Sequence, residues 1–388
     1  MPAHHRTMTV AAVLVAATGL LLSTATAGNA TTVATSTRHD RVQHALADLA
    51  DDGRFPGTLA AVRDENGRTR NYVAGVADLT THAPVPVDGL VRIGSNTKPF
   101  ASVVVLQLVD EGKIVLDAPI ETYLPGRLRG DGIDGRRITV RQLLQHTSGL
   151  PDYVDGLGGT FAELQHTYFS PDDLLRQALT EPARFAPGTR WEYSNTNYVV
   201  AGLMIEKVTG NSVRSEITNR VIRRIGLRHT YFPAPREEGF RGPHPHSYLQ
   251  ETEDSPLLDV TVLDPSWGWA AGAMIASPSD VNRFFVALLD GKLLKPAQLR
   301  QMRATVDAAS GLWPGARYGL GLISTPLSCG GLAWGHGGDI PGYETRNAAT
   351  DDGRAVTVAV TAPPTTEESA EEVRAVVDLG LCGQDRRH

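Results

Sequence analysis

Apolar residues recur along the chain at two spacings, and each spacing predicts one kind of element. Residues 38–51 place apolar side chains three and four positions apart, as a helix does. Residues 59–63 and 70–77 predict two strands around Asn66-Gly67, a dipeptide typical of hairpin turns. Helical spacing with polar starts or glycine stops predicts further helices at residues 100–111, 140–145, 198–208, 278–289 and 366–379.

Strand signals return towards the C-terminal end, at residues 318–323 and 355–361. Residues 126–137 are rich in glycine and charge, which predicts an exposed loop. The order of elements predicts an α/β (α+β) domain built from both ends of the chain, with a mostly helical domain inserted between them. The expected α/β part is about 39–95 and 300–383, and the expected helical part is about 96–299.

The first residues predict an export signal. A basic segment at residues 4–6 precedes an apolar segment at residues 10–22, and Ala25-Thr26-Ala27 fits a cleavage site. The apolar run is short for a membrane span, which needs about 20 residues. We therefore expect a secreted protein without a stable membrane anchor; an uncleaved anchor is the alternative. The predicted order is a signal peptide at 1–27, a disordered leader at 28–38, the folded domain at 39–383 and a C-terminal tail at 384–388.

Composition narrows the class of protein. The 388 residues include 37 Lys+Arg and 43 Asp+Glu, and the net charge of −6 argues against nucleic-acid binding. Two cysteines are too few for a disulfide-stapled mini-protein or a four-cysteine zinc site. Export would allow a disulfide between Cys329 and Cys382, and two buried free thiols are the alternative.

The first candidate for chemistry is Ser95-Asn96-Thr97-Lys98, where a helix is predicted to begin. Ser and Lys three positions apart share one face of a helix. A lysine held beside a hydroxyl in a partly dry site can lose its proton and then accept the serine proton. The start of a helix also favours developing negative charge. Alone, the motif is weak, because this spacing of Ser and Lys also arises by chance.

Two later motifs strengthen the hypothesis of a nucleophilic serine. Tyr193-Ser194-Asn195 supplies a phenol that can relay a proton and an amide that can orient the lysine or bind a carbonyl. His336-Gly337-Gly338 supplies a glycine-rich strand whose backbone N–H groups can approach a substrate closely. The three motifs together predict an acyl-enzyme site.

The three motifs resemble those of the penicillin-recognising serine hydrolases, in the branch of class C β-lactamases and D-alanyl-D-alanine carboxypeptidases. Sequence segments near the motifs are also typical of this family, for example Leu144-Gln145-His146-Thr147-Ser148-Gly149-Leu150. The resemblance covers about residues 40–383 and is strongest to the secreted actinobacterial carboxypeptidases. It implies a β-lactamase/transpeptidase-like fold, in which an antiparallel sheet is flanked by helices. It also implies that Cys329 pairs with Cys382.

The resemblance implies a role for each motif residue. Ser95 would be acylated, with Lys98 as its general base or proton relay. Tyr193 would pass a proton to the leaving group, and Asn195 would bind the acyl-side carbonyl. His336 stands where many relatives carry lysine. The backbone N–H groups of Ser95 and Asp339, beside Gly337 and Gly338, would form an oxyanion hole, and Trp267 would line the pocket or simply pack.

Two departures from the carboxypeptidase pattern bear on the substrate. The chain has His336-Gly337-Gly338-Asp339 where those enzymes have His-Thr-Gly-Thr, so two hydroxyls are missing. The arginine that holds a substrate carboxylate there falls on Ile323. An aspartate at this subsite would repel a carboxylate. If the Asp339 side chain faces solvent, that objection weakens. The departures favour relatives that take esters, amides or D-residues with a free amine.

The sequence thus predicts a secreted, cofactor-free serine hydrolase acting on a small peptide, β-lactam or ester. The first hypothesis is D-alanyl-D-alanine carboxypeptidase activity on cell-wall stem peptides. The alternatives are an esterase, amidase or D-aminopeptidase, and a β-lactamase or a penicillin-binding sensor that does not turn over. We expect a monomer that binds no nucleic acid and no metal. His244-Pro245-His246 is interpreted as a surface loop, and Ser148-Gly149 as a turn rather than part of a second triad with His146 and Asp152.

Overall fold

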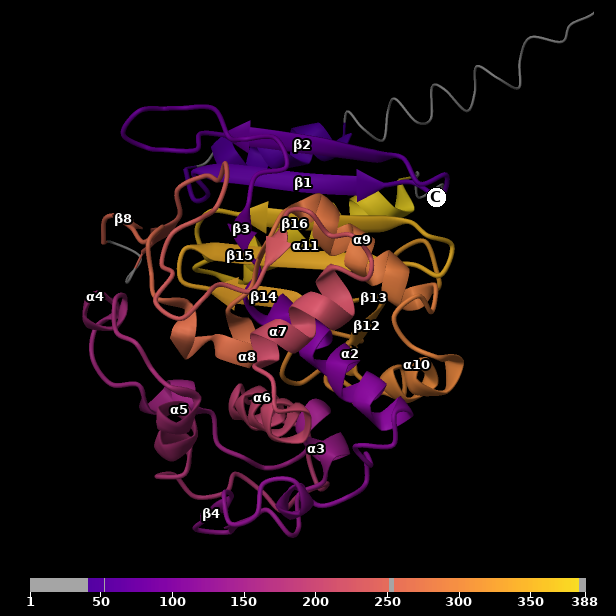
Figure 1. Cartoon of the computed structure of the whole chain (residues 1–388). Helices are drawn as coiled ribbons and strands as arrows, with labels where there is room; N and C mark the ends of the chain where they lie inside the picture. The colour runs from indigo at the N-terminus through magenta and orange to yellow at the C-terminus, as the bar shows by residue number, and fades with distance from the viewer. Residues whose placement is uncertain (1–40, 52, 251–254, 384–388) are drawn as a thin grey trace, which may run out of the picture. The chain divides into compact units, whose positions relative to one another are not determined.

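The computed structural model describes residues 41–51, 53–250 and 255–383 (Figure 1). The chain divides into Met1–Thr37 and a second compact unit, Arg38–His388, to which everything below refers. The predicted signal peptide, leader and C-terminal tail lie outside the described residues. Within the described residues, no helix combines the length and apolar character that a membrane crossing needs.

An antiparallel sheet of nine strands is the centre of this unit. Its strands follow the order β10-β11-β12-β13-β15-β16-β1-β2, with β14 pairing to β15. Both ends of the chain therefore meet in one sheet, since β1 pairs with β16 as well as with β2. The strands are β1 Gly57–Arg63, β2 Thr69–Gly75, β10 Val306–Asp307, β11 Arg317–Tyr318, β12 Ile323–Pro326, β13 Leu332–Gly335, β14 Gly337–Ile340, β15 Tyr343–Ala349 and β16 Ala355–Val360.

Helices cover both faces of the sheet because its central strands are apolar on both sides. In β16, Val356 and Val358 pack in one cluster with the helix at 41–51 and α11 (Glu367–Cys382), while Ala355 and Ala359 belong to the larger core. Successive side chains of a strand point to opposite faces, so a fully apolar strand needs a layer on each. The helix α9 (Pro278–Leu289) packs on that second face.

The middle of the chain is mostly helical. Two buried helices, α2 (Thr97–Asp110) and α6 (Thr196–Thr209), lie against each other below the sheet in the view of Figure 1. The other helices are α3 Val140–Leu144, α4 Phe161–Leu164, α5 Pro171–Ala178, α7 Val213–Ile217, α8 Trp269–Gly272 and α10 Pro296–Met302; single turns are η1 Gly94–Asn96, η2 Ile120–Thr122, η3 Tyr153–Gly156, η4 Thr218–Ile222 and η5 Pro265–Trp267. Short strands pair as β3 (Val91–Arg92) with β9 (Ile275–Ala276), β9 with β6 (Thr230–Tyr231), β4 (Arg129–Gly130) with β5 (Ile133–Asp134), and β7 (Tyr248–Leu249) with β8 (Leu258–Asp259).

The predicted antiparallel sheet flanked by helices is confirmed, one local prediction is wrong, and a second is incomplete. Residues 318–323 form a hairpin rather than one strand, because Gly321 has φ +75° and turns the chain between β11 and β12. Residues 126–137 are not simply an exposed loop. They contain the β4–β5 hairpin, which buries Leu128 and Ile133 in the main core.

Cys329 and Cys382 form a disulfide, with an S–S distance of 2.10 Å and a Cα–Cα distance of 5.5 Å. The bond joins the turn between β12 and β13 to the last residue of α11. The pairing that the sequence left open is therefore made, and it ties the C-terminal helix to the sheet.

Candidate active site

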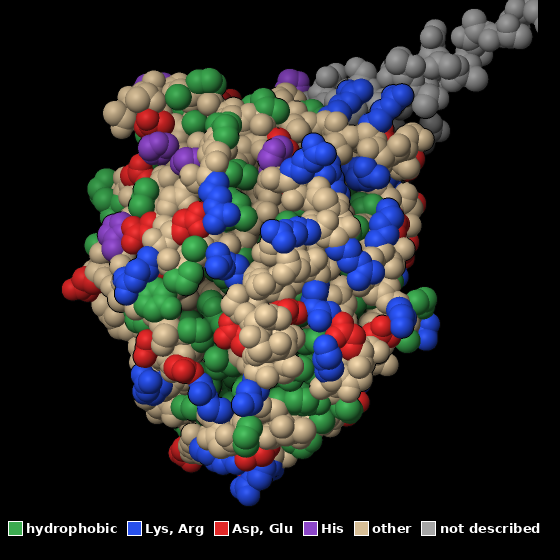
Figure 2. Space-filling model, viewed as in Figure 1, with side chains coloured by type: hydrophobic (Ala, Val, Ile, Leu, Met, Phe, Trp, Pro, Cys, Tyr) green, Lys and Arg blue, Asp and Glu red, His purple; other side chains and the backbone are tan. Residues whose placement is uncertain are grey.

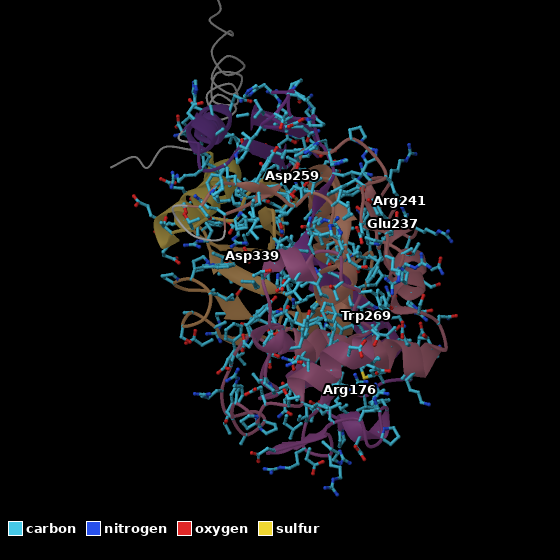
Figure 3. All side chains as sticks on the ribbon, turned by 90° about the vertical axis from the view of Figure 1, so that its left-hand side faces the viewer. Arg176, Glu237, Arg241, Asp259, Trp269 and Asp339 are labelled. Carbon is cyan, nitrogen blue, oxygen red and sulfur yellow. A yellow bond between two sulfur atoms is a disulfide. The ribbon has the colours of Figure 1, made fainter. Side chains whose placement is uncertain are left out.

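A cavity of about 810 Å³ opens between the sheet and the helical part of the fold. It collects the residues of all three motifs, including Ser95, Tyr193, Asn195 and His336, although they are far apart in the sequence. Hydrophobic side chains gather at the surface between α4, α5 and α8 (Figure 2). Figure 3 shows Asp339 at the level where the sheet gives way to the helices. The described lining residues are mostly apolar, which suits an organic substrate.

Ser95 lies in the single turn η1, directly before α2. Gly94 takes φ +49°, which allows the chain to turn sharply from β3 into the helix. Asn96 anchors this turn to β15, because its amide nitrogen is 2.8 Å from the Thr345 hydroxyl and its amide oxygen accepts from Asn347 at 2.5 Å. The nucleophile is therefore presented by a rigid turn between the sheet and the most buried helix.

Lys98 is fully buried in the first turn of α2 and makes three polar contacts. Its Nζ lies 2.8 Å from the Ser95 hydroxyl, 2.8 Å from the Asn195 amide oxygen and 2.9 Å from the Ala271 carbonyl oxygen. The amide and carbonyl oxygens can only accept, so two N–H bonds of the lysine point at them. The remaining tetrahedral position faces Ser95, and in the neutral amine it is the lone pair that would accept the serine proton.

The environment of Lys98 favours this neutral amine. Burial lowers the pKa of Lys98 to about 7, although the nearby carboxylates of Asp152 and Asp339 act to raise it. A substantial share of the enzyme therefore carries a neutral lysine at neutral pH. The usual ammonium form could not take the serine proton.

Asp152 holds Asn195 in the orientation that turns its amide oxygen toward Lys98 Nζ. One carboxylate oxygen of Asp152 accepts from the Asn195 backbone N–H at 2.9 Å and from its side-chain amide nitrogen at 2.8 Å. Because a carboxylate can only accept, the amide nitrogen must face Asp152 and the amide oxygen must face Lys98. Burial raises the pKa of Asp152, and its hydrogen bonds to Asn195 and Val154 oppose that shift.

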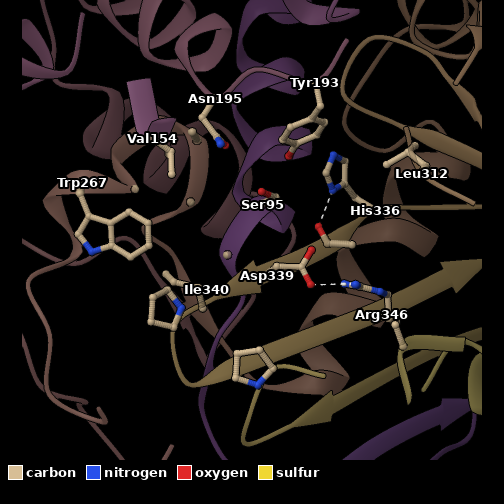
Figure 4. A pocket seen from close by; sticks show the side chains of 18 of the residues that line it. Ser95, Val154, Tyr193, Asn195, Trp267, Leu312, His336, Asp339, Ile340 and Arg346 are labelled. Atoms are coloured by element: carbon tan, nitrogen blue, oxygen red, sulfur yellow. Dashed lines mark hydrogen bonds and ion pairs between the residues drawn. The ribbon is translucent and has the colours of Figure 1, made fainter. Parts of the chain in front are cut away.

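Tyr193 lies beside Ser95 in the cavity, and its hydroxyl points toward the serine (Figure 4). Burial raises the pKa of this phenol well above its ordinary value, so the hydroxyl keeps its proton at neutral pH. Its ring stacks on the His146 imidazole, with centroids 4.3 Å apart, and Lys98 Nζ lies 4.8 Å from the ring centroid. A neutral phenol beside the nucleophile is suited to donate a proton to a leaving group.

His336 is buried and belongs to a chain of neutral hydrogen-bonded groups. Its Nδ1 lies 2.5 Å from the Gly337 carbonyl oxygen, so Nδ1 carries the proton and Nε2 accepts from the Tyr318 hydroxyl at 2.9 Å. His146 Nε2 also lies 3.1 Å from that hydroxyl, while His146 Nδ1 accepts from the Ser194 N–H. Burial lowers the pKa of His336 to about 3, so this imidazole stays neutral.

Gly338 and Gly94 let strand β14 lie directly against the turn that carries Ser95. A β-carbon on Gly338 would lie 2.0 Å from the Ile93 carbonyl oxygen and 2.6 Å from the Thr345 hydroxyl, so only glycine lets β14 lie against η1. A β-carbon on Gly94 would lie 3.1 Å from the Asp339 backbone nitrogen. This close contact places the Asp339 N–H beside the Ser95 turn, where the resemblance predicts the oxyanion hole.

Gly338→Ala is expected to lower kcat strongly, because the added methyl group must push β14 away from the Ser95 turn. Overpacking of this kind typically costs about 1–3 kcal/mol of unfolding free energy. Thermal unfolding and ester turnover would measure the two effects. Gly239→Ala is the matched control, since its β-carbon meets nothing within 4 Å. Equal turnover in both variants would contradict the proposed role of Gly338.

Asp339 faces the pocket with its side chain 63% exposed, and Arg346 on β15 pairs with it at 2.8 Å. The same guanidinium nitrogen lies 2.8 Å from Glu344. The Asp339 side chain is therefore exposed to solvent, which the sequence had left open. Arg346, for which no role was predicted from the sequence, neutralises its carboxylate. Ile323 is buried and supplies no charge at this wall of the pocket.

A family model described as Beta-lactamase matches residues 42–381. The chain belongs to the beta-lactamase family. Its fold is beta-lactamase-like, and the family is one of serine hydrolases, so the resemblance stated from the three motifs is confirmed.

This beta-lactamase family member is similar to three proteins whose descriptions differ: an amidohydrolase, an esterase and a penicillin-binding protein. A D-stereospecific amidohydrolase from Streptomyces sp. has a solved structure with 37% identity and a TM-score of 0.81, covering 89% of this chain and 99% of that one. Esterase EstB of Burkholderia gladioli is 28% identical over 73% of this chain and 81% of its own. Penicillin-binding protein 4* of Bacillus subtilis (strain 168) is 27% identical over 79% of this chain and 68% of its own.

Trp267 lies in η5 and lines the pocket, on the same side of Ser95 as Val154 (Figure 4). The hydroxyl of Tyr153 donates to its backbone carbonyl oxygen, which fixes the turn that carries the indole. Trp267 also packs against the main core, so the structure shows both of the arrangements that the sequence left open. The individual roles of the motif residues stay predictions.

The second triad suggested by sequence does not assemble. The buried Ser148 hydroxyl donates to the Asn197 amide oxygen at 2.6 Å, and Asp152 is bonded to Asn195 instead. In the His244-Pro245-His246 segment, His246 pairs with Asp259 at 2.6 Å. Across the described ranges, no group of three or more His, Cys, Asp or Glu side chains is placed to hold a metal.

The sequence did not predict that Asp152, Tyr318 and Arg346 belong to this site. Tyr318 reaches His336 only because β11 and β13 flank the same strand, β12, and the sequence has no local signal for that. Arg346 did have a signal. Pro341-Gly342 is a turn dipeptide, and a tight hairpin there places residue 346 diagonally opposite Asp339.

Proposed function

We propose that the protein hydrolyses amides and esters of D-residues with an apolar side chain, through an acyl-enzyme on Ser95. The observation that carries the proposal is the charge of the pocket wall. Its two described cationic lining residues are both already paired with carboxylates, Arg346 with Asp339 and Arg374 with Glu367. A substrate carboxylate therefore meets no cation without a partner in the wall, whereas an amide or ester leaving group needs none.

The contacts support a sequence of proton transfers. Neutral Lys98 accepts the Ser95 proton while the serine oxygen bonds to the substrate carbonyl carbon. The developing oxyanion accepts hydrogen bonds from the Ser95 and Asp339 N–H groups. Tyr193 then gives its proton to the leaving nitrogen or oxygen as the scissile bond breaks, and recovers a proton from Lys98. In the second half, water attacks the acyl carbon, the bond from that carbon to the Ser95 oxygen breaks, and a proton of the water passes by way of Tyr193 and Lys98 to the Ser95 oxygen.

The position of Tyr193 assigns the two sides of the cavity. Tyr193 and His336 lie on one side of Ser95, together with Leu312 and Arg346, whereas Val154 lies on the other (Figure 4). The leaving group belongs on the Tyr193 side, because that hydroxyl must protonate it. On the acyl side lie Val154 and the Trp267 indole (Figure 4), and Leu157, Phe161, Leu164 and Phe169 line the same cavity. Such a wall favours a large apolar acyl side chain.

The preference for D-residues is supported by the similarity to the Streptomyces amidohydrolase, which is D-stereospecific by its description. The resemblance of the motifs to D-alanyl-D-alanine carboxypeptidases supports the same stereochemistry. Carboxypeptidase action is the second candidate function, and the similarity to penicillin-binding protein 4* favours it. The two candidates differ in whether the leaving group may carry a free carboxylate.

The test compares one acyl group with different leaving groups. D-phenylalanine amide, D-phenylalanine methyl ester and the dipeptide D-Phe-D-Ala share the acyl part, and L-phenylalanine amide controls stereochemistry. We expect kcat/KM for the amide and ester to exceed that for the dipeptide by about 10-fold or more, the order of one charged hydrogen bond. We expect the L-amide to be the poorer enantiomer.

A faster reaction with the free-carboxylate dipeptide would overturn the proposal in favour of carboxypeptidase action. Equal rates for D- and L-phenylalanine amide would contradict the proposed preference for D-residues. Incubation with a penicillin, followed by intact mass, separates the remaining alternatives. A persistent stoichiometric adduct indicates a sensor, and rapid penicillin hydrolysis indicates a β-lactamase.

We also propose that the protein works outside the cytoplasm. The signal-like sequence at residues 1–27 and the Cys329–Cys382 bond support this, because structural disulfides are typical of oxidising compartments. N-terminal sequencing of protein from the culture medium would test the predicted cleavage after Ala27. Protein found only inside cells, with residues 1–27 retained, would contradict it.

A further inference from the structure

Four residues of the β14–β15 hairpin form one charged face beside the nucleophile. The register pairs Gly337 with Arg346 and Asp339 with Glu344. Alternate residues of a strand share a face, and directly paired residues lie side by side, so these four side-chain positions are neighbours. Two carboxyl groups therefore stand opposite each other, an arrangement that normally destabilises a sheet.

Arg346 resolves that conflict by lying diagonally across the hairpin. Its Nη2 is 2.8 Å from the Asp339 carboxylate and 2.8 Å from that of Glu344, and its side chain is only 11% exposed. Gly337 makes this path possible, because a β-carbon there would lie 3.0 Å from Arg346 Nη1. A guanidinium is thus built into the pocket wall on the leaving-group side of Ser95.

Asp339, rather than Glu344, is the anion that neutralises this guanidinium at neutral pH. Glu344 is 2% exposed, and among the described residues one of its two oxygens has no hydrogen-bond partner. Burial raises the pKa of Glu344 to about 8, so it is mostly protonated at pH 7. Partial loss of hydration in the pocket acts to raise the pKa of Asp339, but the Arg346 guanidinium outweighs it and lowers that pKa below its usual value.

We propose that Arg346 is a carboxylate-binding residue that Asp339 keeps occupied, so that Asp339 determines whether the leaving group may end in a free carboxylate. The inference rests on the proposed function, for which it names the specificity-determining pair. Guanidinium and carboxylate pair through parallel N–H bonds. Asp339 occupies an N–H of Arg346 Nη2, and removing its charge frees that donor, at the same place in the wall, for a carboxylate of the substrate.

The rival receptor in the same wall is Arg374 of α11. It pairs with Glu367 at 2.9 Å, and its guanidinium carbon lies 5.9 Å from the Trp313 ring centroid. Glu367 is 79% exposed, so this pair is weakly held in water. An experiment on Arg346 therefore needs the matched change at Arg374.

The test measures a ratio of two substrates in each variant. D-Phe-D-Ala and D-Phe-D-Ala amide differ only in the terminal carboxylate, so general damage to turnover cancels in the ratio of their kcat/KM values. We expect Asp339→Asn to raise the carboxylate-to-amide ratio about 10-fold to 100-fold, the range of a hydrogen bond to a charged group. Adding Arg346→Gln to Asp339→Asn should return the ratio to the wild-type value or below, and adding Arg374→Gln should not.

Each other outcome overturns the inference. An unchanged ratio in Asp339→Asn means that Asp339 does not control carboxylate acceptance. A raised ratio that survives Arg346→Gln means that Asp339 acts by repulsion alone, and one that is lost with Arg374→Gln assigns the receptor to α11. Failure of the proposed function shows in the wild-type enzyme, before any substitution is made: it would then prefer the free-carboxylate dipeptide, or would cleave simple esters but no D-residue substrate.

Discussion

Ser95→Ala is expected to abolish covalent adduct formation and to reduce kcat/KM by about 10⁴-fold to 10⁶-fold, the range found when a catalytic serine is removed. The reason is structural. Among the described residues, the Ser95 hydroxyl is the one placed 2.8 Å from Lys98 Nζ, the base that would take its proton. Turnover of a D-residue ester and intact mass after incubation with a slow acylating substrate would measure the effect.

Ser148→Ala is the control for this prediction. Ser148 lies in a turn beside the site, but its hydroxyl donates to the Asn197 amide oxygen and it is not part of the described pocket lining. We expect it to keep the adduct on Ser95 and most of the turnover, with a modest loss of stability. Loss of the adduct in Ser148→Ala, in protein that still unfolds cooperatively, would mean that the wrong serine has been assigned.

Lys98→Arg is expected to reduce kcat/KM by about 10²-fold to 10⁴-fold, the usual contribution of a general base. Arginine keeps the positive charge but cannot lose its proton in a protein, so it cannot accept the Ser95 proton. In the wild-type enzyme, burial lowers the pKa of Lys98 to about 7. Because the neutral form is the active one, kcat/KM for an uncharged ester should rise with pH as pH passes through about 7 and then level off.

The pH profile needs a control, because one other group of the site titrates nearby. Burial raises the pKa of Glu344 to about 8, whereas the pKa of His336 is lowered to about 3 and plays no part in this range. We expect Glu344→Gln to retain the rise near pH 7 and Lys98→Arg to lose it. A rise that persists in Lys98→Arg, or that vanishes in Glu344→Gln, would reassign the titration.

Several features of this protein could be predicted from sequence because their signals are local. Apolar spacing placed the helices α2, α6 and α9 to within a few residues. The candidate nucleophile, base and proton donor could be named because each belongs to a short motif of neighbouring residues. The pairing of Cys329 with Cys382 was one of two alternatives, and the structure shows it made.

Other predictions failed where a distant contact overrode a local pattern. The alternation from residue 318 to 323 suits a strand, but Gly319 and Gly321 turn the chain there, and Leu320 and Leu322 enter the main core. Residues 126–137 have the composition of a loop, yet Leu128 and Ile133 are buried. In both cases the side chains pack against elements that the sequence does not place beside them.

The sequence by itself determined the family, an antiparallel sheet flanked by helices and a candidate set of reacting side chains. Only the tertiary structure decided their electrostatics. The pKa of Lys98 depends on burial and on Asp152, which lies 54 positions away in the chain. The charge of the pocket wall depends on Arg346 reaching across a hairpin to Asp339. A pKa and a local charge are set by everything within a few ångströms, and that neighbourhood exists only once the chain has folded.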